Sequence, residues 1–114
     1  MAIKRMFHKD VVTTDKFTSL PLSCQALYFQ ICMLADDEGF VGNPEKLLNL
    51  RGRSRYAVEK LVEAGYLYKC DSGVVFVMHW KLHNSIPLDR FHHTVYVDEK
   101  NEISSLFQNM YLFV

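Results

Sequence analysis

Residues 54–82, which read SRYAVEKLVEAGYLYKCDSGVVFVMHWKL, carry the pattern from which the fold is predicted. Its first part is amphipathic, because apolar residues recur three or four positions apart and a helix would gather them on one face. These residues are Ala57, Val58, Leu61 and Val62. Ser54 is a favoured N-cap residue and Gly65 a favoured stop, so the pattern predicts a helix over residues 55–64.

The second part is typical of a β-hairpin. Residues 66–70 and 74–82 are rich in β-branched and aromatic side chains, and the turn-forming run Asp71-Ser72-Gly73 lies between them. Side chains alternate in direction along a strand, so each face of the second strand is expected to carry every other residue. One face would carry Val74, Phe76, Met78, Trp80 and Leu82, and the other Val75, Val77, His79 and Lys81. Trp80 is the only tryptophan, and we expect it in the core.

Upstream, the sequence predicts a central helix that ends in an acidic turn. Ser23 is a candidate N-cap, and residues 23–35 are apolar on nearly all sides, which indicates a buried helix. The run Asp36-Asp37-Glu38-Gly39 would end this helix, and Gly39 suits the left-handed conformation that is common after a helix. A short helical turn over residues 13–19 is expected before it.

Two short elements connect the central helix to the decisive stretch. Phe40-Val41 would add one rung to a small sheet. Asn43 and Pro44 then suit the cap and the first position of a helix that continues over residues 45–50. Gly52 would break this helix.

The predicted order is therefore helix, short strand, helix, helix, strand, turn, strand. This order places the chain in the α+β class and is that of a winged helix, with a helix-turn-helix and a β-hairpin wing. We expect residues 1–97 to form this domain, extended over 88–97. Residues 98–114 would form a C-terminal segment that packs on the domain or dimerises. That segment is either one amphipathic helix or a helix followed by a strand over 110–114.

Composition agrees with one folded domain. The 114 residues are 49% hydrophobic and carry no net charge, unlike a disordered chain. Cys24, Cys32 and Cys70 form no CxxC pair and lie among apolar residues, which predicts reduced, buried thiols in a cytoplasmic protein. We expect no secretory signal, and no apolar run reaches the ~18 residues of a membrane span.

The zero net charge hides a basic middle. Residues 43–70 carry six Lys or Arg against three Glu, whereas residues 11–42 carry one Lys against four acidic residues. A local basic patch is enough for phosphate contacts. The basic residues at the start, Lys4, Arg5, His8 and Lys9, are expected to form a solvated terminus.

The arginines of this basic middle are candidate DNA contacts. In a helix-turn-helix, the N-terminal end of the second helix contacts base edges in the major groove. An arginine side chain is able to donate two parallel hydrogen bonds to guanine or to phosphate. A helix N-terminus with its capping serine also suits phosphate. The candidates on the two helices are Arg51, Arg53, Ser54, Arg55, Tyr56, Lys60, Asn43 and Lys46. Lys69 and Lys81, on the outer face of the predicted hairpin, would reach the backbone, although Asp71 at its tip would repel phosphate.

The sequence predicts neither an enzyme nor a bound cofactor or metal. It contains no GxSxG, GxGxxG or HExxH motif. The acidic run 36–38 has no further spaced ligands. On a strand, His79 and His83 would lie about 13 Å apart, which is too far for one metal ion. Cys70 with these two histidines lacks the second cysteine of a zinc finger.

Several runs together resemble the N-terminal winged-helix domain of phage replisome organiser, or replication initiator, proteins (DnaD-like). The runs are Arg5-Met6-Phe7, Asp15-Lys16-Phe17, residues 20–29, 35–41, Asn43-Pro44, residues 79–84, Asp89-Arg90-Phe91 and Thr94-Val95-Tyr96. They cover roughly residues 4–100. The resemblance implies duplex DNA binding at a phage or mobile-element replication origin. It also implies recruitment of host helicase-loading proteins by a C-terminal part that lies beyond this domain. It implies no particular base contacts.

Two other functions suit the same fold. A transcriptional regulator would use the same helix-turn-helix at a promoter. A protein-interaction module would agree better with the zero net charge, and the apolar stretch 106–114 would then suit a homodimer surface.

Overall fold

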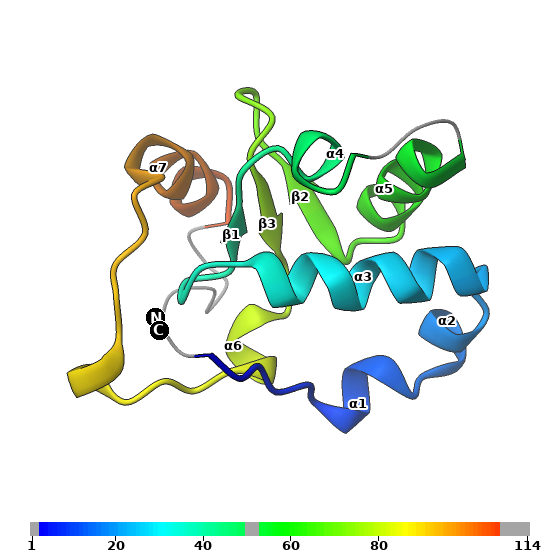
Figure 1. The fold of residues 1–114 in the computed structure, drawn as a ribbon, viewed down its shortest axis with the longest axis horizontal. Helices are drawn as coiled ribbons and strands as arrows, with labels where there is room; N and C mark the ends of the chain where they lie inside the picture. Colours follow the sequence, from blue (N-terminus) through cyan, green and yellow to red (C-terminus); the bar gives the residue numbers. More distant parts are fainter. Residues whose placement is uncertain (1–2, 50–52, 108–114) are drawn as a thin grey trace.

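A three-stranded antiparallel sheet with helices on both sides organises the chain, as the computed structural model shows for residues 3–49 and 53–107 (Figure 1). The strands are β1 (Phe40–Val41), β2 (Leu67–Lys69) and β3 (Val75–Val77), in the order β1-β3-β2. The longer helices are α3 (Leu22–Leu34), α5 (Arg53–Glu63) and α7 (Val97–Leu106). Shorter ones are α1 (Lys9–Val12), α2 (Asp15–Thr18), α4 (Pro44–Leu47), α6 (Trp80–His83) and the 3-10 turn η1 (Leu88–Arg90). The expected α+β class is confirmed.

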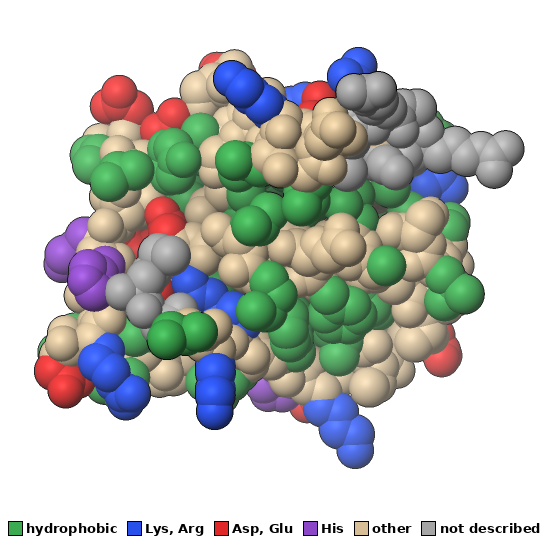
Figure 2. Space-filling model, in the orientation of Figure 1, with side chains coloured by type: hydrophobic (Ala, Val, Ile, Leu, Met, Phe, Trp, Pro, Cys, Tyr) green, Lys and Arg blue, Asp and Glu red, His purple; other side chains and the backbone are tan. Residues whose placement is uncertain are grey.

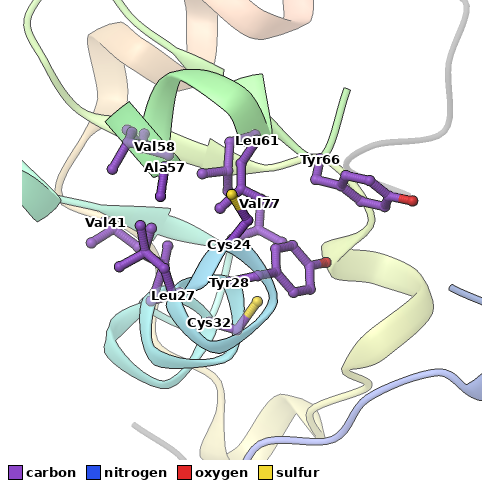
Figure 3. Close-up of a cluster of buried hydrophobic side chains, with 14 of the residues drawn as sticks. Cys24, Leu27, Tyr28, Cys32, Val41, Ala57, Val58, Leu61, Tyr66 and Val77 are labelled. Carbon is purple, nitrogen blue, oxygen red and sulfur yellow. The ribbon is translucent and has the colours of Figure 1, made fainter. Parts of the chain in front are cut away.

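The main core lies between α3, α5 and one face of the sheet (Figure 3). Tyr28 and Leu61 are fully buried there, between the two helices and the strands. The labelled side chains of this cluster converge from both helices and from β1 and β3: Cys24, Leu27, Tyr28, Cys32, Val41, Ala57, Val58, Leu61, Tyr66 and Val77. Burial of these apolar groups is the principal force that fixes α5 against α3.

A second, smaller core covers the other face of the sheet. Phe40 and Phe76 are opposite each other in register, with their ring centroids 4.9 Å apart, and Ile103 of α7 is fully buried with them. Phe107, just after α7, packs edge-on against Tyr68 with ring centroids 5.6 Å apart. Both faces of the sheet are therefore buried. The helix predicted after residue 98 is found one residue earlier, and residues 108–114, with the alternative strand, lie outside the described residues.

The prediction of one long strand over residues 74–82 is wrong. β3 ends at Val77, and α6 follows from Trp80. Val75 and Val77 are fully buried rather than on an outer face, because α7 and α3 cover opposite faces of the sheet. Trp80 is buried as expected, but Leu82 is exposed. The turn at His79 accepts backbone hydrogen bonds from Leu82 and His83 and so starts a helix.

The other predicted helices are present with shifted ends. α3 begins at Leu22 behind Pro21 and has no side-chain cap, so Ser23 lies inside the helix. α5 likewise begins at Arg53, so Ser54 lies in its first turn and is not the cap. Gly39 and Gly65 have positive φ angles of 90° and 88°, as their predicted roles require. However, α3 already ends at Leu34, and Gly39 belongs to the turn that follows.

The acidic turn after α3 binds distant parts of the chain together. Asp36 Oδ1 accepts backbone hydrogen bonds from Glu38 and Phe40, which shapes the turn. Glu38 accepts a 2.7 Å hydrogen bond from the backbone N–H of Thr94 and pairs with Lys100 of α7. Burial opposes the charge of Glu38, but these bonds and the charges of Lys100 and His93 outweigh it and lower its pKa. The turn therefore ties segment 92–100 to the core.

Arg5 corrects the prediction of a solvated basic terminus. Its guanidinium is buried, with Nη1 3.1 Å from Asp37 Oδ1 and Nη2 donating to the carbonyl of Ala35 at 2.6 Å. It also lies 5.1 Å from the centroid of the Trp80 ring. Lys4, His8 and Lys9 are exposed, as expected. One residue of the terminus is thus part of the structural core.

His83 fixes the N-terminal segment to α3 and is held neutral. Its Nδ1 accepts a 2.8 Å hydrogen bond from the backbone N–H of His8, so this nitrogen carries no proton. Its Nε2 lies 2.7 Å from the Tyr28 hydroxyl oxygen and donates to it in this tautomer. Burial lowers the pKa of His83 to about 4, and the charges of His79 and His8 act in the same direction.

A neutral, buried His83 makes the fold sensitive to mild acid. In the unfolded chain, this histidine binds a proton near pH 6.5. In the folded protein, His83 binds a proton only as the pH approaches its pKa of about 4. Its contribution is therefore complete above pH 6.5 and is lost as the pH falls towards 4. Between pH 7 and pH 5 we expect the free energy of unfolding to drop by about 2 kcal/mol from this group. Urea unfolding at the two pH values measures the drop, which should be smaller by that amount in His83→Gln. Equal pH dependence in His83→Gln and in the wild type would contradict this.

Candidate nucleic-acid interface

α4 is placed by the cap that the sequence predicts. Asn43 Oδ1 accepts from the backbone N–H groups of Glu45 and Lys46 at 3.1 and 3.4 Å, and Pro44 occupies the first turn. Pro44 is buried, whereas Asn43 and Lys46 are exposed. One side of the short helix therefore packs against the protein, and the other side faces solvent.

α5 buries one face and exposes the other. Ala57, Val58 and Leu61 are buried, as their spacing predicts. Arg55 and Tyr56 are exposed at its N-terminal half. A further candidate on this helix, Lys60, is half-buried, with its ammonium 5.7 Å from the centroid of the Tyr56 ring. This outward face also carries Glu59 and Glu63.

One carboxylate brings two of the predicted cations together. Glu45 of α4 lies 3.6 Å from Arg55 Nε of α5, through Oε2, and 3.9 Å from Lys69 Nζ of β2, through Oε1. Arg55 and Lys69 are 14 positions apart in the sequence but share this counter-charge. The side chain of Glu45 is only 21% exposed, whereas that of Arg55 is 61% exposed. Glu45 was not among the predicted site residues; the only sequence signal was an acidic residue just after a helix cap.

The tip of the hairpin lies beside the start of α4. Gly73, in the turn, has a φ of 94°, and a Cβ added there would lie 3.9 Å from the Asn43 side-chain nitrogen. In Figure 1, α4 lies between the hairpin and α5, at the upper edge of the molecule. Asn43, Arg55 and Lys69 therefore belong to one continuous edge.

The opposite side of the hairpin is acidic. Ser72 Oγ donates to Glu99 Oε2 at 2.7 Å, and the Tyr68 hydroxyl donates to Glu102 Oε2 at 3.0 Å, both on α7. Figure 2 shows acidic side chains over α7 and Lys or Arg side chains along the upper edge. The acidic side chains of α7 would repel a polyanion, whereas the α4 and α5 side presents exposed cations.

Three of the predicted site residues are not described in full, and one is placed elsewhere. Arg51 lies outside the described residues, and of Arg53 and Ser54 only the backbone is described, in the first turn of α5. Lys81 is exposed on α6, not on the hairpin, and α6 lies on the other side of α3 from α4 and α5 (Figure 1). His79 likewise precedes α6. The shortened β3 is the reason, since the chain turns away from the sheet after Val77.

No protein-family model, no curated protein and no solved structure matches the chain. Across residues 3–49 and 53–107, no helix is long and apolar enough to cross a membrane. Within those same ranges, histidine, cysteine and acidic side chains nowhere gather in threes as metal ligands would. The three thiols are free and buried, and burial raises the pKa of Cys32 to about 12 and that of Cys70 to about 11.

Proposed function

We propose that this chain binds duplex DNA as a winged-helix module, with α5 in the major groove and the β2–β3 hairpin as the wing. The observation that carries the proposal is the meeting of exposed cations from separate elements at one edge. Arg55 comes from α5 and Lys69 from β2, and both lie within 4 Å of the same carboxylate of α4. The element order and the β1-β3-β2 sheet support the winged-helix assignment.

The exposed face of α5 has the chemistry that a groove-reading helix uses. Arg55 is suited to paired hydrogen bonds with guanine, and Glu59 to accepting a hydrogen bond from cytosine. Lys46, Lys69 and Asn43 are suited to phosphate oxygens on either side, which set the position of a protein without reading the sequence. The acidic α7 limits the duplex to the α4 and α5 side of the hairpin.

The resemblance to phage replisome organiser proteins supports a replication origin as the target, with recruitment of host helicase-loading proteins left to a part beyond this domain. Preference for origin DNA over random DNA of equal length would support that role. Preference for promoter DNA instead would support a transcriptional regulator with the same interface.

Replacing two arginines of α5 tests the interface itself. We expect Arg53→Ala/Arg55→Ala to weaken duplex binding by about tenfold or more, because two phosphate or base contacts are lost. The slope of log affinity against log salt should become shallower by up to ~1.8. Fluorescence anisotropy with a labelled 20-base-pair duplex over a salt series measures both.

The matched control is Lys81→Ala, which removes an exposed cation on α6, away from this edge. It should leave affinity within about twofold. Absence of wild-type binding at 50 mM salt, where phosphate contacts are strong, would overturn the proposed function. A partner protein bound independently of salt would then favour the interaction module.

A further inference from the structure

We propose that Glu45 limits the affinity of this interface for the phosphates of any duplex, an inference that rests on the proposed function. Its carboxylate offsets part of the positive charge of Arg55 and Lys69 in the free protein. By doing so it weakens phosphate contacts that do not depend on DNA sequence. The affinity for random DNA and the affinity for a specific site are lowered by the same factor.

Glu45 is held more firmly than the cations that it binds. The Asn43 side chain accepts a hydrogen bond from the backbone N–H of Glu45, and Pro44 of the same turn is buried. Its carboxylate is 21% exposed, against 61% for the Arg55 side chain and 47% for that of Lys69. The negative charge therefore stays at the edge, while both cations are free to turn towards a phosphate.

DNA is able to displace the two cations from Glu45, but the negative charge of Glu45 still lowers the affinity. Exposed ion pairs contribute little to stability, so a duplex displaces Arg55 and Lys69 from Glu45 readily. The carboxylate itself then remains close to the phosphates and repels them. This penalty is the same for every sequence. Random DNA is the simplest substrate on which to measure it, because phosphate contacts supply almost all of its affinity.

The test is Glu45→Gln, which keeps the shape of the side chain and removes its charge. With a random 20-base-pair duplex near 0.1 M salt, we expect binding about 5- to 20-fold tighter than wild type. Because one negative charge is removed from the interface, the salt dependence should steepen by up to ~0.9 in slope. In the background Arg55→Ala/Lys69→Ala, the same substitution should give less than about a twofold gain, because without these two cations no phosphate is held beside Glu45.

Asp89→Asn is the matched control, since it removes one exposed negative charge on η1, away from α4 (Figure 1). It should change affinity less than about twofold. If wild type binds DNA but Glu45→Gln, folded with an unchanged Tm, binds no more tightly, the inference about Glu45 is overturned and the proposed function stands. If wild type binds no duplex at all, the proposed function itself is overturned and this inference with it.

Discussion

Gly39→Ala is expected to lower the free energy of unfolding by about 3 kcal/mol or more. Gly39 has a φ of 90°, a conformation that costs an L-residue about 1–2 kcal/mol. An added Cβ would also lie 2.6 Å from Cγ of Trp80 and 2.8 Å from its Cβ. Overpacking a rigid core of this kind costs typically 1–3 kcal/mol more. Urea unfolding at pH 7, followed by circular dichroism, measures the loss.

Gly73→Ala is the control that separates the two causes. Gly73 has nearly the same backbone, with a φ of 94°, but an added Cβ would have no neighbour closer than 3.9 Å. It should therefore cost only the backbone strain, about 1–2 kcal/mol. Equal losses in the two variants would show that contact with Trp80 contributes nothing.

Asp37→Asn is expected to destabilise the protein by about 3–5 kcal/mol. The substitution keeps an oxygen that is able to accept the 3.0 Å hydrogen bond from the backbone N–H of His92. It removes the charge that neutralises Arg5, whose side chain is 2% exposed. Breaking a buried ion pair on one side costs this much because the remaining charge stays buried without compensation.

The double variant Arg5→Met/Asp37→Asn tests that cause directly. If the cost comes from the uncompensated guanidinium, the double variant should be more stable than Asp37→Asn alone. The exposed Asp71→Asn at the hairpin tip should change stability by less than about 0.5 kcal/mol. A double variant whose loss equals the sum of the two single losses would rule out coupling between Arg5 and Asp37.

Local patterns predicted the elements near the interface well. The cap at Asn43 and Pro44 depends on neighbouring residues alone, and so does the buried stripe of Ala57, Val58 and Leu61. The left-handed Gly65 follows from the same kind of local signal. These features were therefore readable from the sequence.

Features that depend on distant partners were not readable. The end of β3 is set by the fit of Trp80 against Gly39 and by the hydrogen bond from its indole N–H to the Asp37 carbonyl. The burial of Arg5 depends on Asp37, 32 positions away. The sequence did not predict Glu45 as a site residue, because its contacts require α4 to lie beside both α5 and β2. No local sequence pattern indicates that arrangement.

The anchoring of the N-terminal segment bears on how the chain folds as it is synthesised. Met6 donates its backbone N–H to Asn84, and His8 to His83, so these contacts join residues 78 and 75 positions apart. During synthesis, Met6 and His8 therefore have no native partners until residues 83 and 84 have followed. Contacts so distant in sequence slow folding, because a large loop must close before they form. Until then Phe7 can pack edge-on against Phe29 but not against His83.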